Sequence, residues 1–293
     1  MANVLITGCS SGIGLATAVA LARAGHQVCA TMRNPSRASA LKELIEKEKL
    51  PVSTTVLDVD SDESVRDAVA VIRAKAGYID TLVNNAGIER SGSVEETPVS
   101  DFKTCMETNY FGNLRCIKAC LPDMKQRRRG CIINVSSVAG RLSSSPMTPY
   151  TASKWALEAL SEGLAQEVKP YNIRVALVEP GIISTPMADR IADAPSQSEY
   201  PHVRRFPLMF QAALATHRGP EIVAEKIREI IEGGTWQLRH PVGPDAQPFL
   251  DWRRSMNDQE WIEWGALDDE AWYARVQKDF GMDVRPKGSS AQA

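Results

Sequence analysis

Short apolar, β-branched runs alternate with amphipathic stretches along most of this chain, and this alternation restricts its fold more than any other feature. Strand-like runs are predicted at residues 3–6, 27–32, 53–57, 81–84, 131–136, 173–179 and 236–240, with helix-like segments between most of them. Strands that alternate with helices form a parallel sheet whose two faces the helices cover. We therefore expect an α/β fold: a single doubly wound domain with a parallel seven-stranded sheet flanked by helices.

The rhythm changes after Pro186, and this change divides the chain. Residues 188–218 mix Pro, Ser, His and Arg with short apolar pieces, which predicts a substrate lid within a catalytic domain at residues 1–246. Residues 247–286 contain four of the six tryptophans and predict a C-terminal helical extension. We expect it to cover one edge of the domain or a subunit interface rather than to form a substrate wall. The small polar residues 287–293 predict a disordered tail.

Composition narrows the classes of partner. The formal net charge of −2 leaves no broad cationic surface for nucleic acid or anionic lipid. We interpret the basic run at residues 125–129 as the solvated end of a helix. The six cysteines form no CxxC pair, so we expect reduced thiols, with neither disulfides nor a metal site. Without a leader or an apolar run of about 20 residues, the sequence predicts a cytoplasmic protein with no membrane segment.

A glycine loop follows the first predicted strand directly, as Thr7-Gly8-Cys9-Ser10-Ser11-Gly12-Ile13-Gly14, and a helix begins there. Glycines let the backbone turn sharply and approach a pyrophosphate, while the helix N-terminus binds the anion. The spacing is GxxxGxG rather than the common GxGxxG, and a plain tight turn would also need glycine. Its position after the first strand favours a dinucleotide site of the Rossmann type.

The end of the second strand bears on the choice of cofactor. NAD-binding units carry an acidic residue there for the ribose 2′-hydroxyl, but this chain reads Ala30-Thr31-Met32-Arg33-Asn34. The planar guanidinium of Arg33 suits a 2′-phosphate, so NADP(H) is favoured over NAD(H). A solvated surface arginine is the alternative.

Tyr150 and Lys154 stand four residues apart at the start of a predicted helix, which places both side chains on one face. An ammonium beside a phenol favours the phenolate, and this makes the tyrosine a usable proton carrier near neutral pH. An exposed amphipathic pair would show the same spacing, so the pair gains meaning only from its context.

Five motifs occur together: the loop at residues 7–14, Asn84-Asn85-Ala86-Gly87, Asn134-Val135-Ser136-Ser137, the Tyr150/Lys154 pair and Pro180-Gly181-Ile182-Ile183-Ser184-Thr185. In this order the chain, over about residues 2–243, resembles the short-chain dehydrogenase/reductase family. In that family a serine lies thirteen residues before the tyrosine, which selects Ser137, and an asparagine of the preceding long helix matches Asn109.

The resemblance implies a role for each of these residues. Tyr150 would donate or accept the substrate proton, and Ser137 would hydrogen-bond the reacting oxygen. Lys154 would hold the nicotinamide ribose and lower the pKa of the tyrosine, while Asn109 would position a water linked to the lysine. For Asn85, a role in bracing the sheet is as good an interpretation as a ligand contact. The implied cofactor contacts are Gly8, Ser10, Ser11, Gly12, Ile13, Gly14, Arg33, Asp58, Val59, Asn84, Ala86, Gly87, Tyr150, Lys154, Pro180, Gly181, Ile183 and Thr185.

Within the family, Cys9-Ser10-Ser11, Ala30-Thr31-Met32-Arg33 and residues 239–246 look like the hydroxysteroid and retinol dehydrogenase branch. This likeness implies an apolar alcohol or carbonyl substrate and adds Ser10 and Ser11 to the 2′-phosphate site. Family members associate through two long helices, here about residues 101–127 and 150–169, so we expect a homodimer or homotetramer. The tryptophan-rich extension departs from the pattern.

The sequence therefore predicts an NADP(H)-dependent oxidoreductase acting on a carbonyl or a secondary alcohol. Two alternatives stay open: an NAD-dependent alcohol dehydrogenase of the same fold, and a protein that senses NADP without turnover. Hydrolase chemistry at Ser137 would require a histidine base, but His202, His217 and His240 lie in the lid or beyond it. For the lid, Met187, Phe206, Leu208, Met209 and Phe210 would either line a pocket or pack on the core.

Overall fold

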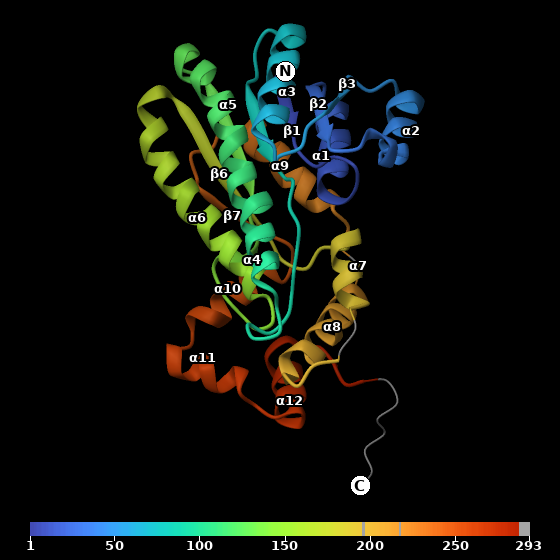
Figure 1. The fold of residues 1–293 in the computed structure, drawn as a ribbon, viewed down its shortest axis with the longest axis vertical. Helices are drawn as coiled ribbons and strands as arrows, with labels where there is room; N and C mark the ends of the chain where they lie inside the picture. The colour runs from blue at the N-terminus through green and yellow to red at the C-terminus, as the bar shows by residue number, and fades with distance from the viewer. Residues whose placement is uncertain (195–196, 217, 287–293) are drawn as a thin grey trace.

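The computed structural model describes residues 1–194, 197–216 and 218–286. Its centre is a seven-stranded parallel sheet with the strand order β3-β2-β1-β4-β5-β6-β7, flanked by helices (Figure 1). The predicted fold class is confirmed. The strands are β1 (Asn3–Ile6), β2 (Gln27–Met32), β3 (Val52–Val56), β4 (Thr81–Asn84), β5 (Gly130–Val135), β6 (Ile173–Pro180) and β7 (Arg239–Val242).

The predicted and observed strand bounds differ most at β7. The prediction began at Trp236, whereas the strand begins at Arg239. The indole of Trp236 is 45% exposed and lies under the ammonium of Lys169, 3.5 Å from the ring centroid. Trp236 therefore lies on the protein surface and is not part of β7. Its contact with Lys169 can form there, because a cation–π interaction does not require a buried ring.

Successive residues of each strand point to opposite faces of the sheet, and each face has its own core. From β1, Val4 and Ile6 enter one core and Leu5 enters the other. The first core is closed by α1 (Gly12–Arg23), α2 (Ser39–Glu48) and α9 (Glu221–Gly233). The second is closed by α3 (Asp62–Ala76), α5 (Gly112–Arg127) and α6 (Thr148–Val168).

The long helix predicted at residues 101–127 is interrupted. It consists of α4 (Val99–Met106), a π-helical segment at Glu107–Phe111, and α5. Such π-helical segments inside α-helices are frequent at functional sites. At the far end of α5, Arg127 and Arg129 both form ion pairs with Asp80, which agrees with the interpretation of the basic run as a helix end.

The segment predicted to be a lid contains α7 (Pro186–Ala192) and α8 (Pro201–Leu214), and the predicted extension contains α10 (Ala246–Arg254), α11 (Asp258–Gly265) and α12 (Asp269–Phe280). In Figure 1 the extension lies at the end of the molecule that also carries α8. Leu208 and Met209 of α8 pack against a cluster built around Trp272 and Val276. The tail predicted to be disordered, residues 287–293, lies outside the described residues. No helix within the described ranges is long and apolar enough to cross a bilayer.

Candidate active site

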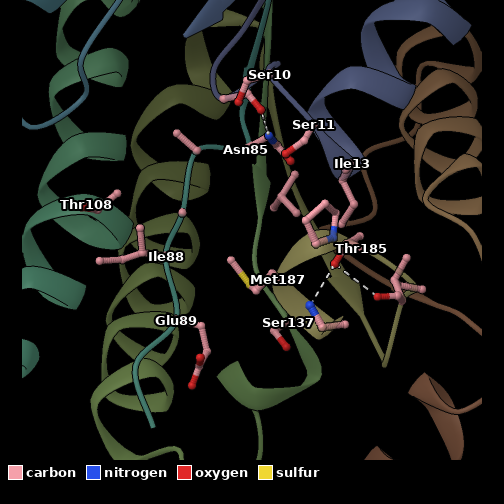
Figure 2. Close-up of a pocket in the computed structure, with 18 of the residues that line it drawn as sticks. Ser10, Ser11, Ile13, Asn85, Ile88, Glu89, Thr108, Ser137, Thr185 and Met187 are labelled. Atoms are coloured by element: carbon pink, nitrogen blue, oxygen red, sulfur yellow. Dashed lines mark hydrogen bonds between the residues drawn. The ribbon is translucent and has the colours of Figure 1, made fainter. Parts of the chain in front are cut away.

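The carboxyl ends of β1, β4, β5 and β6 meet at one edge of the sheet, where the strand order reverses between β1 and β4. In open parallel sheets, ligands bind in the crevice at this reversal. A cavity of about 350 Å³ lies there (Figure 2). It brings together most of the predicted site residues: Gly8, Ser10, Ser11, Gly12, Ile13, Arg33, Asp58, Val59, Ala86, Gly87, Ser137, Tyr150, Lys154, Pro180, Gly181, Ile183 and Thr185.

The glycine loop needs its glycines for two physical reasons. Gly8 and Gly12 have positive φ angles of 73° and 56°, a conformation that is strained for other residues. A Cβ atom on Gly14 would overlap the carbonyl oxygen of Gly8, so Gly14 lets the loop fold onto the first turn of α1. Gly14 does not line the cavity, but it allows the loop residues that do line it to adopt their conformation. Ser11, the residue before α1, makes no capping hydrogen bond with its side chain, which leaves the N-terminal N–H groups of α1 for an anion.

Asn85 holds this loop from the next strand. Its Nδ2 donates hydrogen bonds to the carbonyl oxygens of Thr7 (2.9 Å) and Gly8 (3.2 Å). The Thr7 hydroxyl in turn accepts from the backbone N–H groups of Asn85 (3.0 Å) and Ala86 (2.9 Å). Asn85 thus braces the sheet edge, and it also lines the cavity, where a ligand contact stays a prediction. The loop is therefore preformed, which suits a dinucleotide pyrophosphate.

One end of the cavity is cationic. Arg33 is exposed and lines it together with Ser10, Ser11 and a second arginine, Arg37, which the sequence analysis missed. Arg37 lies four residues after Arg33, in the short 3₁₀ helix Pro35–Arg37. A second arginine this close in the sequence was the signal that could have identified it. Asp60 lies in the same region, where burial raises the pKa of its carboxyl group and the charge of Arg33 opposes that rise. Two guanidinium groups and two hydroxyls suit a 2′-phosphate.

Tyr150, Lys154 and Ser137 meet in the middle of the cavity. Helix α6 carries the tyrosine and the lysine, and the Lys154 Nζ lies 5.6 Å from the centroid of the Tyr150 ring. The hydroxyls of Ser137 and Tyr150 are hydrogen-bonded. Ser137 also accepts a hydrogen bond from the Ala139 N–H (3.1 Å), and the Lys154 Nζ donates one to the carbonyl oxygen of Val135 (2.8 Å). A proton-carrying group and an oxygen-binding group therefore face one ligand space.

The pKa values in this site depart from the simplest expectation. Burial raises the pKa of the Tyr150 phenol, and the hydrogen bond from Ser137 only partly offsets this rise. Burial also lowers the pKa of the Lys154 ammonium to about 8. The pKa of the phenol is thus raised overall, because desolvation is its largest cause, and a lowering of the tyrosine pKa by Lys154 stays a prediction. Burial therefore favours the protonated phenol.

Asn109 does not line the cavity, which differs from the prediction that it positions a water beside Lys154. Asn109 belongs to the π-helical segment, and its buried side chain forms hydrogen bonds within the protein. Nδ2 donates to the Ile88 carbonyl and the Ser153 hydroxyl, both at 2.9 Å, and Oδ1 accepts from the Ile88 N–H at 2.8 Å. Asn109 therefore fixes the backbone that leads from β4 along the cavity wall.

Asn84, predicted as a cofactor contact, is not among the described residues that line the cavity. The side chain is 1% exposed and its Nδ2 donates to Oδ1 of Asn134 (2.9 Å), whose own Nδ2 donates to the Ser161 hydroxyl (2.8 Å). This relay joins β4, β5 and α6 inside the fold. Asn84 is the last residue of β4 and points into the protein, and a motif alone does not reveal that direction.

The segment between β6 and α7 faces the glycine loop. Thr185 caps α7 by accepting a hydrogen bond from the Ala188 N–H (3.3 Å) and donates one to the Ile183 carbonyl (3.3 Å) (Figure 2). Asp245, which the sequence analysis did not assign to the site, holds this segment in place. Its carboxylate accepts a hydrogen bond from the Ile182 N–H at 2.7 Å. A Cβ atom on Gly181 would overlap that carboxylate. Asp245 therefore positions the segment from Pro180 to Thr185, which contains predicted cofactor contacts.

The remaining wall is partly apolar and includes residues of α7 and α8. Met187 and Phe210 line the cavity, whereas Phe206 packs with Phe210 and Leu208 and Met209 face the extension. Phe210 therefore lines the cavity, whereas Leu208 and Met209 pack on the extension from the other side of α8. No histidine is among the described residues that line the cavity, and His217 lies outside the described residues. Lining residues that the sequence analysis did not assign to the site also include Met32, Asn34, Leu57, Ile88, Glu89, Thr108, Met147, Arg190 and Ile191.

Comparison with known proteins agrees with this geometry. A family model described as short chain dehydrogenase matches residues 2–196. Retinol dehydrogenase 8 of Bos taurus is 43% identical over 204 residues, which cover 68% of this chain and 64% of that protein. A 3-ketodihydrosphingosine reductase of Bacteroides thetaiotaomicron is 41% identical, covering 67% of this chain and 70% of the relative. The match therefore spans less than two thirds of the retinol dehydrogenase.

Solved structures extend the likeness. A short-chain dehydrogenase from Streptomyces avermitilis is 34% identical, with a TM-score of 0.77, and covers 90% of this chain and 97% of its own. A gluconate 5-dehydrogenase from Burkholderia cenocepacia, solved with NADP and tartrate, is 26% identical, with a TM-score of 0.73 and coverage of 84% and 95%. A match to 90% of this chain includes part of the C-terminal extension. The chain belongs to the short-chain dehydrogenase/reductase family of oxidoreductases, in its retinol dehydrogenase-like branch.

Proposed function

We propose that this protein is an NADP(H)-dependent oxidoreductase that transfers a hydride between nicotinamide and a carbonyl or secondary alcohol, with Tyr150 as general acid and base. One observation carries the proposal: the glycine loop, Arg33 and the Ser137, Tyr150 and Lys154 side chains line one continuous cavity. A dinucleotide can therefore extend from the cationic end to the tyrosine.

The residues that would hold the cofactor follow from their places in the cavity. The N-terminus of α1 and the glycine loop suit the pyrophosphate, and Arg33, Arg37, Ser10 and Ser11 suit a 2′-phosphate. When bound, the nicotinamide supplies or accepts the hydride. The segment from Pro180 to Thr185 would orient its ring toward Tyr150.

The protein's own chemistry is proton transfer and oxygen binding. The raised pKa of Tyr150 keeps the phenol protonated at neutral pH, so it can donate to a carbonyl oxygen as that oxygen gains charge. Ser137, hydrogen-bonded to the phenol, stabilises the same oxygen. Lys154, buried one turn along α6, supplies a charge that favours loss of the phenolic proton in the reverse direction.

The substrate is proposed to be an apolar alcohol or ketone. Met147, Met187, Ile191 and Phe210 give the space beside Tyr150 an apolar lining. Relatives named as a retinol dehydrogenase and a 3-ketodihydrosphingosine reductase support alcohol and ketone chemistry.

The test is a titration of the purified protein with NADPH and NADH, followed by fluorescence, in the wild type and in Arg33→Ala. We expect Arg33→Ala to weaken NADPH binding by about 10- to 100-fold, the worth of a charge-assisted contact, and to leave NADH binding within about twofold. Equal binding of both cofactors by the wild type would favour an NAD-dependent alcohol dehydrogenase. Tight NADPH binding without turnover of any ketone or aldehyde would favour a sensor.

We also propose a cytoplasmic homodimer or homotetramer that associates through α5 and α6. Phe111, just before α5, is 42% exposed, and Trp155 on α6 is 50% exposed. Large exposed aromatic side chains on long helices favour an interface. Light scattering tests this proposal, and a monomeric mass would refute it. The six buried free thiols suit a reducing compartment.

A further inference from the structure

The loop at residues 141–147 lies between Ser137 and Tyr150 in the chain and forms neither helix nor strand. Its last residue, Met147, lines the cavity, so the conformation of the loop sets one part of the ligand space. Among the described residues that line the cavity, none comes from residues 247–286. The extension can therefore act on that space only through a segment such as this loop.

Apolar packing joins the first part of the loop to the extension. Leu142 packs against a buried cluster that contains Phe249 and Leu250 of α10. The same cluster contains Val138, the residue directly after Ser137. Apolar burial is not directional, so this packing holds the loop against the extension without fixing the position of Met147.

A directional contact holds the middle of the loop. The indole Nε1 of Trp261, on α11, donates a hydrogen bond to the carbonyl oxygen of Ser143 at 3.1 Å. The hydroxyl of Ser143 is in turn hydrogen-bonded to the hydroxyl of Thr151, at 3.3 Å. Thr151 follows Tyr150 on α6. Ser143 therefore connects the extension to the first turn of the helix that carries Tyr150.

The ring of Trp261 is itself held on several sides. It stacks on the ring of Trp264, with the centroids 5.9 Å apart and an interplanar angle of 5°. The ring of Trp252 meets it edge-on at 5.1 Å, and the guanidinium of Arg253 lies 5.1 Å from its centroid. These contacts restrict the direction of the indole N–H. A donor with a fixed direction holds its acceptor, the Ser143 carbonyl, in one place.

We propose that Trp261 is a positioning residue for substrate binding: its hydrogen bond to Ser143 holds the loop at residues 141–147 so that Met147 closes one wall of the substrate space. The inference rests on the proposed function for the nature of the substrate, an apolar alcohol or ketone. The glycine loop and Arg33 lie on other segments, so the effect should fall on the substrate rather than on the cofactor.

The experiment compares the wild type with Trp261→Phe in the NADPH-dependent reduction of acetophenone and of 1-phenylhexan-1-one. Phenylalanine keeps an aromatic ring in the stack and removes the Nε1 donor. We expect the KM for both ketones to rise by about 3- to 10-fold, the worth of one hydrogen bond. Both kcat and the affinity for NADPH should stay within about twofold, because the loop contributes to binding and not to proton transfer.

The matched control is Trp252→Phe. Trp252 belongs to the same aromatic cluster, but its Nε1 donates to Asp279 inside the extension, at 3.2 Å. This variant also loses an indole hydrogen bond, yet its KM should stay within about twofold of the wild type. Equal KM increases in the two variants would show that the extension acts only through its stability and would overturn the proposal. An unchanged KM in Trp261→Phe would overturn it as well.

Hydrogen exchange followed by mass spectrometry tests the loop without turnover. The N–H groups of Leu142 and Met147 donate to the carbonyl oxygens of Val138 (3.1 Å) and Ser144 (3.0 Å). The peptide that covers residues 141–149 should exchange several-fold faster in Trp261→Phe and at the wild-type rate in Trp252→Phe. Wild-type exchange in Trp261→Phe would contradict the role of its hydrogen bond. If the wild type reduces no ketone but the exchange changes as expected, the proposed function fails and the role of Trp261 in holding the loop stands.

Discussion

The cofactor side and the substrate side of the cavity are built in different ways. On the cofactor side, backbone groups and short side chains hold one another: Asn85 braces Thr7 and Gly8, and Gly14 packs on Gly8. On the substrate side, the lid helix α8 turns Phe210 toward the cavity and Leu208 toward the extension. The first wall is fixed by local geometry, and the second depends on packing between distant segments.

The extension packs on α8 rather than on the cavity. Among the described residues that line the cavity, none comes from residues 247–286. The contacts lie on the outer side of α8, where buried Arg205 pairs with Asp269 and lies 5.5 Å from the centroid of the Trp272 ring. Changes in the extension should thus act on substrate binding, whereas changes in the glycine loop should act on the cofactor.

The largest expected effect lies where the two sides meet. Tyr150→Phe removes the proton donor and retains the ring, so kcat/KM should fall by about 100- to 10,000-fold. Binding of NADPH should stay within about twofold, measured by the same fluorescence titration. A variant that keeps most of the activity would show that another group carries the proton.

Gly14→Ala should affect the cofactor side alone. The added methyl meets the Gly8 carbonyl, which should cost about 1–3 kcal/mol of stability and weaken NADPH and NADH binding alike, by about tenfold or more. The control is Gly163→Ala, because a Cβ on Gly163 meets nothing within 4 Å. That variant should bind normally and gain about 0.5–1 kcal/mol, since alanine favours a helix interior. Equal thermal unfolding and equal binding in the two variants would contradict this account.

Lys154 gives a prediction about pH. Its folded-state pKa is lowered to about 8, so between pH 8 and pH 10 the unfolded chain binds more protons than the folded one. Stability from this group must therefore rise with pH, by at most about 1.4 kcal/mol per pH unit. Denaturant unfolding should show the free energy of unfolding of the wild type rising relative to that of Lys154→Met over that interval. A constant difference would mean that the pKa of the lysine is not lowered.

The smallest effect is expected on the substrate side. Asp269→Asn removes the partner of buried Arg205, and we expect a loss of about 1–2 kcal/mol because the aspartate itself is half exposed. The KM for an alcohol or ketone should rise a few-fold with NADPH binding unchanged. Glu270→Gln, at an 80% exposed neighbour, is the control. A change in NADPH affinity in Asp269→Asn would break the separation of the two sides.

Sequence reasoning predicted the sheet and most of the cavity lining because these depend on local patterns. The bounds of β1, β2 and β4 agree with the prediction, since each is a short apolar run between turn residues. It did not foresee the π-helical segment at Glu107–Phe111 or the inward direction of Asn84. Both depend on partners far along the chain: Asn109 binds Ile88, and Asn84 binds Asn134.

By itself, the sequence determined the parallel fold, the phosphate loop and the pairing of Tyr150 with Lys154, because period, glycine position and helical spacing act over a few residues. Only the tertiary structure decided that burial raises the pKa of Tyr150, that Asn84 and Asn109 form hydrogen bonds within the protein, and that the extension packs on α8. Desolvation, pairing and packing depend on what surrounds a side chain, and those surroundings come from residues far apart in the chain.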